Sequence, residues 1–458
     1  MRYPFRKKTI VVFTALFILV SLGLTLSLYL PPSNKKIYAG IDLEKHASIA
    51  KDQQFLDLMK SFTLGLDDIQ MPFLQLDYRR NIPRGRSSKA VAGHQQFFDQ
   101  IKSEIDQIDP LTLSPELRLD YHIISFETAL NLEYLALESQ LPEKLIITND
   151  GLFNLPDGPS WYKYFVKRWT SSNITPEEVL AYGESEIERV KSEIRAIKQQ
   201  SGQSDFEFFI NSDQFLTRDV EEIRTGFEEM KQTVDEHLIK VFPEHHKLPD
   251  IKIERGTNPS LANVPGFYSN NTFYFNLFTE PFNKRQMDWL FIHEANPGHH
   301  FQITYANTLD LPAYRSYFNY AGYSEGWAAY VENLGQEVGL YKTPYAYLGK
   351  WEWDLIRSTR LVLDVGINYY GWDDEKALAY WRKHIRGKDE IGWREIKRMR
   401  KWPAQVLTYK IGARQIKELK QEWVDGGKIS LKSFHTFLLN KGSVPVEAVP
   451  YLFAQAVQ

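Results

Sequence analysis

A proline–glycine pair, Pro297 and Gly298, interrupts the most histidine-rich segment of the chain, His293-Glu-Ala-Asn-Pro-Gly-His-His300. Proline removes the backbone N–H that would bond to the carbonyl of His293, and glycine adopts dihedral angles that other residues avoid. These two residues predict that no single straight helix runs through the segment. The chain is therefore expected to fold around a break, with histidines on both sides of it.

The residues before the break predict a helix that carries the first histidine. Met287, Leu290 and Phe291 follow the i, i+3, i+4 spacing of one helix face, in a helix expected from Lys284 onward. Residues 271–278 precede this helix and are rich in β-branched and aromatic side chains, which predicts a strand.

The remainder of the chain is predicted to be mainly α-helical. Amphipathic patterns run from Leu117 to Leu137 and from Val220 to Val241. Thr175-Pro-Glu-Glu178 combines a capping threonine, a proline at the first helical position and a capping glutamate. We find no repeat or domain boundary after residue 40, so residues 41–458 are predicted to form one helical domain.

The N-terminal region predicts a membrane anchor. Residues 9–30 are apolar and uncharged, and this run is long enough to cross a bilayer as a helix. It is longer than the apolar core of a cleaved signal peptide, which favours an uncleaved anchor. Residues 1–8 carry more cationic side chains than the short tether at 31–40. This bias predicts a cytoplasmic N-terminus and a domain in the periplasm or outside the cell.

Composition excludes several classes of function. The chain has no cysteine, which rules out disulfides, thiolate catalysis, cysteine-ligated metals and a lipid-modified cysteine. The formal net charge is −3, so we expect no nucleic-acid partner, because such proteins present a strong positive field. Metal ligands would have to be histidines and carboxylates.

The histidine-rich segment is related to the zinc signature His-Glu-x-x-His, in which two histidines bind Zn²⁺ and the glutamate activates water. Here Pro297 stands at the position of the second histidine. His300 would share a helix face with His293, but an ideal helix would separate them by about 10 Å. We therefore predict that the break brings one of His299 and His300 to the same Zn²⁺ as His293, with His300 slightly favoured.

A third metal ligand is predicted on a later helix. Glu325 would complete a site of two histidines and one glutamate, leaving a fourth position for water. Glu332 is seven residues further on the same helix face, where it is predicted to orient an imidazole. Glu294 is the predicted general base.

The two motifs His293-Glu-Ala-Asn-Pro-Gly-His-His300 and Glu325-Gly-Trp-Ala resemble the bacterial family called domain of unknown function 885, and similarity continues at 360–367 and 403–412. That family is similar to the all-helical metallopeptidases of the angiotensin-converting-enzyme and thimet-oligopeptidase types. The resemblance implies a mainly α, all-helical zincin-like fold with a small β element near the active site. It also implies zinc-dependent hydrolysis of short peptides, with the strand at 271–278 as an edge strand lining the substrate. Family members usually carry a histidine where this chain has Asn368.

Two further residues are candidates for catalysis. Tyr409 and Arg360 would stabilise the tetrahedral oxyanion or hold a substrate carboxylate, as would the histidine of the 299–300 pair that does not bind metal. Each has a purely structural alternative: Tyr409 in the core, and Arg360 paired with Asp364 four residues later.

Two other functions remain open from the sequence. Gly322-Tyr-Ser-Glu-Gly326 matches the nucleophile elbow of serine hydrolases, with Ser324 as nucleophile, a strand at 317–321, and His384 or His435 downstream. Alternatively, the chain is a non-catalytic envelope protein that retains the fold.

Overall fold

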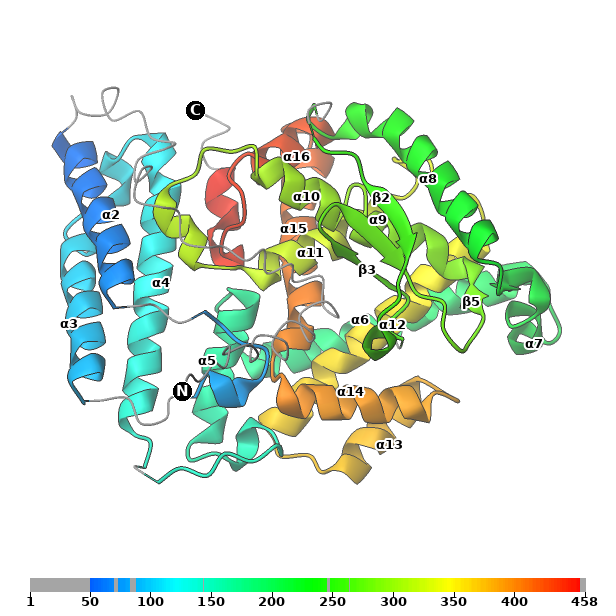
Figure 1. The fold of residues 1–458 in the computed structure, drawn as a ribbon, viewed down its shortest axis with the longest axis horizontal. Coiled ribbons are helices and arrows are strands. Elements are labelled where there is room, and N and C mark those ends of the chain that lie inside the picture. The colour runs from blue at the N-terminus through cyan, green and yellow to red at the C-terminus, as the bar shows by residue number, and fades with distance from the viewer. Residues whose placement is uncertain are drawn as a thin grey trace, which may run out of the picture.

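The chain folds into a mainly helical molecule, as predicted (Figure 1). The computed structural model describes residues 50–69, 73–82, 88–142, 144–244, 248–262 and 264–453. The predicted anchor and tether therefore lie outside the described residues. Among the helices that are described, none is both long and apolar enough to cross a membrane.

Helices make up most of the described structure, and a small sheet lies among those on one side of the molecule. The α-helices are α2 (Ala50–Asp68), α3 (Ser88–Ile105), α4 (Pro115–Ser139), α5 (Gly158–Thr170), α6 (Pro176–Ser201), α7 (Phe206–Ile210), α8 (Val220–Val241), α9 (Met287–Glu294), α10 (His299–Ala306), α11 (Ala321–Val331), α12 (Pro344–Asn368), α13 (Asp374–His384), α14 (Asp389–Lys401), α15 (Thr408–Lys420) and α16 (Leu431–Leu439). In Figure 1, α2 to α4 form one side of the molecule, while α8 and the sheet lie at the other.

The predicted helices form where their local signals place them. The pattern at 117–137 becomes α4, and the pattern at 220–241 becomes α8. At the start of α6, the Thr175 hydroxyl accepts a hydrogen bond from the Glu178 N–H at 3.2 Å, and the Glu178 carboxylate accepts one from the Thr175 N–H at 2.8 Å. This reciprocal capping satisfies two backbone donors that a helix start otherwise leaves unpaired.

The main sheet has three strands in the order β2-β4-β3. β2 (Lys252–Arg255) pairs in parallel with β4 (Thr272–Phe275), and β3 (Gly266–Ser269) pairs antiparallel with β4. The predicted strand at 271–278 is present as β4, but its predicted edge position is wrong, because β4 is central and β2 and β3 form the two edges. A smaller sheet pairs β1 (Leu216–Thr217) with β5 (Phe282–Asn283).

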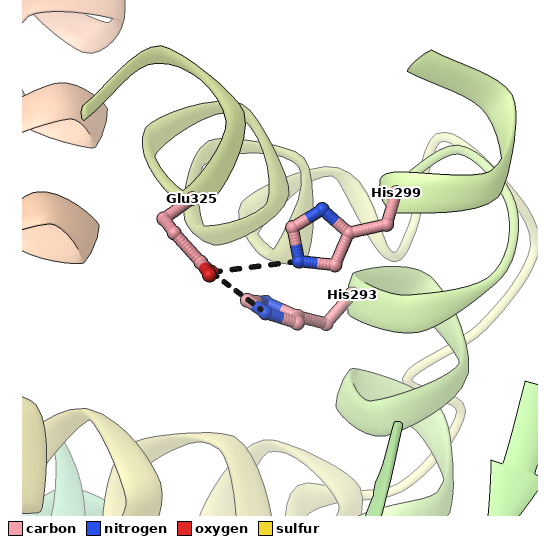
Figure 2. A group of neighbouring side chains, drawn as sticks. All are labelled: His293, His299 and Glu325. Atoms are coloured by element: carbon pink, nitrogen blue, oxygen red, sulfur yellow. Dashed lines mark ion pairs between the residues drawn. The ribbon is translucent and has the colours of Figure 1, made fainter. Parts of the chain in front are cut away.

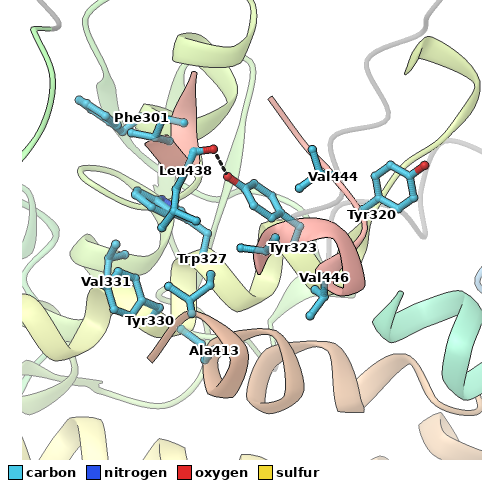
Figure 3. Close-up of a cluster of buried hydrophobic side chains, with 14 of the residues drawn as sticks. Phe301, Tyr320, Tyr323, Trp327, Tyr330, Val331, Ala413, Leu438, Val444 and Val446 are labelled. Carbon is cyan, nitrogen blue, oxygen red and sulfur yellow. Dashed lines mark hydrogen bonds between the residues drawn. The ribbon is translucent and has the colours of Figure 1, made fainter. Parts of the chain in front are cut away.

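A cluster of buried aromatic and aliphatic side chains surrounds α11 at the centre of the molecule (Figure 3). Trp327 and Tyr330 of α11 are fully buried there, and the Tyr323 hydroxyl donates to the carbonyl of Leu438 at 2.6 Å. α15 packs along the other side of α11 through Ala413. The element that carries Glu325 is thus fixed in position by packing on several sides.

Candidate metal centre and adjoining pocket

Three helices bring the candidate ligands together (Figure 2). α9 ends at Glu294, the chain turns through residues 295–298, and α10 begins at His299. The predicted helix break is therefore present. His293 comes from the end of α9, His299 from the start of α10, and Glu325 from α11.

The ligand atoms of His293, His299 and Glu325 all lie within 4.8 Å of one another. Nε2 of His293 is 3.6 Å from Oε2 of Glu325, and Nε2 of His299 is 3.4 Å from the same oxygen. The two imidazole rings are nearly perpendicular, at 85°, with centroids 4.9 Å apart. This arrangement points two nitrogens and one carboxylate oxygen at a common point.

The turn between α9 and α10 is held closely against its neighbours. A Cβ atom on Gly298 would lie 1.9 Å from the His293 carbonyl oxygen, so only glycine fits this approach. The indole N–H of Trp327 donates to the Pro297 carbonyl at 2.8 Å. Because Trp327 is on α11, this hydrogen bond ties the turn to the helix that presents Glu325.

The preference for His300 over His299 is wrong in this structure. The imidazole of His300 interacts with the Pro249 carbonyl at 2.9 Å and with the Tyr268 hydroxyl at 3.3 Å, away from the three converging groups. The preference rested on a continuous helix, in which residues seven apart share a face. Because a new helix starts at His299, that register does not apply.

The carboxylate of Glu332 orients His293, as predicted. Nδ1 of His293 lies 2.7 Å from Glu332 Oε1, which leaves Nε2 facing Glu325. Nη1 of Arg357 donates to both oxygens of Glu332, at 2.7 and 2.8 Å. Arg357 was not identified from the sequence. The sequence feature that could have identified it is a charged residue on the mostly apolar face of α12, three residues before Arg360.

The charges at the centre are strongly coupled. Burial by itself lowers the pKa of His293, but hydrogen bonds to the carboxylates of Glu325 and Glu332 outweigh it and raise the pKa to about 9. Burial raises the pKa of Glu325, but the two imidazoles outweigh it and lower the pKa to about 2. The centre is thus built to keep the Glu325 carboxylate ionised although its side chain is only 1% exposed.

The donor set fits a metal ion. Nε2 of His299 and Oε2 of Glu325 are buried, and their nearest polar contacts are the 3.4 and 3.6 Å approaches among the three converging groups themselves, longer than well-formed hydrogen bonds. Buried polar atoms are nearly always paired, so these atoms have the properties of ligands to a cation. Two imidazoles and one carboxylate form a set typical of catalytic zinc sites.

Glu294 follows His293 directly in the sequence, and its carboxylate is bound by the strand β3. Its Oε2 accepts a hydrogen bond from the backbone N–H of Tyr268 in β3 at 3.0 Å. Burial raises the pKa of Glu294 above its ordinary value, which makes its carboxylate a stronger proton acceptor. The sequence analysis missed β3, although Asn270 and Asn271, both at positive φ, form the tight turn of a hairpin between β3 and β4.

A pocket of about 210 Å³, here called the inner pocket, opens next to the ligands, and both His293 and Glu294 line it. Tyr409 and Arg360, the two further catalytic candidates, line the same pocket. The ring of Tyr409 stacks on that of His293 at a centroid distance of 6.2 Å. Arg360 pairs with Glu395 at 2.8 Å, so the alternative pairing with Asp364 is wrong.

Asn368, which was also singled out in the sequence, lies away from the pocket. Asn368 is fully buried, donates to the carbonyls of Asp364 and Met399, and accepts from the Leu152 N–H. It therefore has a packing role, and it is not among the residues that line the pocket.

The serine-hydrolase alternative lacks its structural context. Ser324 lies inside α11, and the strand expected at 317–321 is absent: a 3₁₀ helix ends at Tyr317, residues 318–320 have no regular secondary structure, and α11 begins at Ala321. Both ring nitrogens of His435 are engaged, by the Tyr330 hydroxyl and the Val241 carbonyl, and His384 interacts with Lys191. Neither histidine is bonded to Ser324.

Solved structures share this fold. A protein described as a candidate lipoprotein from Colwellia psychrerythraea matches with a TM-score of 0.62 and 24% identity, over 81% of this chain and 69% of that one. A candidate lipoprotein of unknown function from Shewanella oneidensis matches with a TM-score of 0.53 and 21% identity, over 81% and 72%. Metallocarboxypeptidase 1 of Trypanosoma cruzi matches with a TM-score of 0.39 and 11% identity, over 90% and 95%, which is too distant to show a shared fold.

Comparison with curated proteins finds no match. A family model, described as a bacterial protein of unknown function (DUF885), matches residues 125–451. This range includes the turn at Pro297, all three converging ligands and the adjoining pocket. Because the match spans more than half of the chain, the protein belongs to the DUF885 family.

Proposed function

We propose that this protein is a zinc-dependent peptidase that hydrolyses peptide bonds in short peptides. The observation that carries the proposal is the convergence of His293, His299 and Glu325 beside Glu294, next to a pocket that His293 and Glu294 line. When bound, Zn²⁺ supplies a Lewis acid that lowers the pKa of water toward about 7.

The chain's own residues supply positioning and proton transfer. Glu332 and Arg357 hold the imidazole of His293 in one orientation. Glu294, whose pKa burial raises, accepts the proton of the attacking water and passes it to the leaving amine. The Tyr409 hydroxyl and the Arg360 guanidinium remain candidates for stabilising negative charge in the transition state.

The edge strand β3 gives the peptide a place to bind. Its Tyr268 N–H points to Glu294, on the side away from β4. An extended peptide on this side would add a strand to the sheet, which orients its backbone without demanding particular side chains. A second hollow of about 1200 Å³ shares Trp289 and Trp353 with the inner pocket, and it provides the approach from solvent.

The test compares wild type with Glu294→Gln on a library of short peptides. We expect the variant to bind zinc as the wild type does, because Glu294 is not among the three ligands, and to lose hydrolysis by a factor of about 10² to 10⁴. Zinc content is measured by elemental analysis and cleavage by mass spectrometry. If zinc binds stoichiometrically and the wild type cleaves no peptide, the alternative of a non-catalytic envelope protein is favoured.

An envelope location is part of the proposal. It is supported by the anchor predicted at residues 9–30 and by the description of two structurally similar proteins as candidate lipoproteins. Because this chain has no cysteine, its attachment would be the apolar segment itself. To test this location, protease is added to cells whose outer layer is permeabilised and whose inner membrane is intact. Digestion of the helical domain is expected if it lies outside the inner membrane.

A further inference from the structure

The part of the inner pocket lined by α12 and α14 carries an excess of positive charge, most of it largely buried. Arg360 of α12 and Arg394 and Arg398 of α14 surround a single carboxylate, that of Glu395. Arg360 is 2.8 Å from this carboxylate, while Arg394 and Arg398 are each 3.7 Å from it. The fourth arginine in the pocket, Arg357, is already paired with Glu332. Three guanidinium groups therefore share one negative charge.

Several nitrogen donors in this part of the pocket lining have no partner. The Nε atoms of Arg360 and Arg398 and the indole nitrogen of Trp402 are buried without a hydrogen bond among the described residues. The side chain of Arg360 is only 4% exposed and that of Arg398 is 15% exposed. These atoms are themselves shielded from the pocket, but the three guanidinium groups that line it carry more charge than the single carboxylate of Glu395 neutralises, which favours an anion there.

The residues that carry the unpartnered donors line the same pocket as the candidate ligand His293. Arg360, Arg398 and Trp402 line the cavity together with His293 and Glu294. Tyr409 lies between the two groups, since its ring stacks on His293 and its hydroxyl interacts with Arg398. A small substrate with its scissile bond at the ligands would therefore place its next group against the arginines.

We propose that Arg398, assisted by Arg360 and Arg394, binds a carboxylate of the substrate, so that this site selects peptides with a negative charge next to the cleaved bond. All three line the inner pocket, and Arg398 is the best placed, because it is more buried than Arg394, its nearest carboxylate is 3.7 Å away, and its Nη2 donates only to the neutral Gln405 amide oxygen, at 2.8 Å. Arginine suits this role because its planar group donates two parallel hydrogen bonds to a carboxylate. The proposal rests on the proposed peptidase function for the identity of the ligand as a substrate.

Binding without turnover tests the proposal separately from hydrolysis. The full chain carrying Glu294→Gln is titrated by calorimetry with three nearly isosteric probes: acetyl-alanyl-glutamine with a free C-terminus, its C-terminal amide, and acetyl-alanyl-glutamate amide. The first carries a terminal carboxylate, the second has no charge, and the third carries a side-chain carboxylate. We expect at least one acid to bind about tenfold to a hundredfold more tightly than the neutral amide.

Variants assign the preference to the arginines. Arg398→Gln is expected to abolish most of the preference, and Arg398→Lys to retain part of it, because lysine keeps the charge but loses the planar geometry. Arg382→Gln, which removes an exposed arginine paired with Asp389 on another helix, serves as the control and is expected to keep the full preference. Glu395→Gln removes the competing carboxylate and is expected to strengthen acid binding, an effect that a misfolded variant would not produce.

The outcomes separate the two claims. If the free acid binds more tightly than the neutral amide, the site recognises a terminal carboxylate. If the glutamate amide binds more tightly than the neutral amide, the site recognises an acidic side chain. Equal binding of all three probes, or a full preference retained in Arg398→Gln, overturns the inference even if the wild type hydrolyses peptides. A wild type that prefers acids but cleaves nothing overturns the peptidase function alone.

Discussion

At the scale of single residues, Glu332 is expected to affect metal affinity through His293, although it is not one of the three candidate ligands. Its carboxylate holds Nδ1 of His293 at 2.7 Å and is itself held by Arg357. Glu332→Gln weakens the acceptor for the imidazole and leaves the buried Arg357 without a counter-charge. We expect zinc affinity to fall by about 10- to 100-fold, measured by competition with a chromogenic chelator.

Glu395→Gln is the matched control for this experiment. It also removes a buried carboxylate paired with an arginine, Arg360, but it makes no contact with an imidazole. We expect its zinc affinity to match that of the wild type. If both variants fold and bind zinc equally well, Glu332 does not tune the ligand.

The residue scale also shows how far the sequence predicts the site. His293 and Glu325 follow from motif spacing, because each lies in a regular helix. The choice between His299 and His300 depends on where the second helix starts, which no local pattern specifies. Arg394 and Arg398 carry no motif, and their role arises only because α14 packs against α12.

At the scale of helices, glycines set the distance between α11 and α15. A Cβ on Gly412 of α15 would lie 1.8 Å from the carbonyl oxygen of Gly322 and 2.7 Å from Cα of Gly326, both in α11. These are backbone atoms, which cannot move aside as a side chain would. Gly412→Ala is therefore expected to push the helices apart, lower the midpoint of thermal unfolding, and weaken zinc binding through Glu325. Overpacking of this kind costs about 1–3 kcal/mol.

Gly93→Ala provides the comparison, because it is the same substitution in a helix, α3, with nothing within 4 Å of the added Cβ. Alanine favours helices over glycine by about 0.5–1 kcal/mol, so this variant is expected to be unchanged or slightly more stable. Equal effects of both substitutions on unfolding and zinc affinity would show that the contact between α11 and α15 does not position Glu325.

The elements themselves were predicted with uneven success. Helices with amphipathic patterns and capping residues, such as α4, α6 and α8, follow from local sequence because their signals repeat every turn. The order of strands does not, since pairing of β2 with β4 joins segments that are separated along the chain. The asparagine turn after β3 is a local signal, and it would have predicted the hairpin.

At the scale of the whole molecule, a second cluster of buried apolar side chains packs around α5 and α12. The carboxyl group of Asp364 lies beside it, where several segments of the chain meet. Asp364 of α12 accepts hydrogen bonds from the Tyr162 hydroxyl of α5 at 2.7 Å and from the Ala404 N–H, after α14, at 2.9 Å. Both bonds go to Oδ1, and Oδ2 is buried without a partner among the described residues. This carboxyl group therefore links three parts of the chain and should report on global unfolding.

Burial raises the pKa of Asp364 from its ordinary value of 3.8 to about 7 in the folded protein. Between these two values the unfolded chain has released the proton and the folded chain retains it. The contribution of Asp364 to the free energy of unfolding therefore decreases as the pH rises through this window, and it becomes constant above about pH 7.

Asp364→Asn keeps an oxygen acceptor for Tyr162 and Ala404 but has no proton to release. We expect the stability of the variant relative to the wild type to increase between pH 4 and pH 7, by a total on the order of a few kcal/mol. Urea unfolding followed by tryptophan fluorescence at several pH values measures this difference. A constant offset between the two proteins is expected from the changed polar group, so the informative quantity is the slope, and parallel curves would show that Asp364 titrates normally in the folded state.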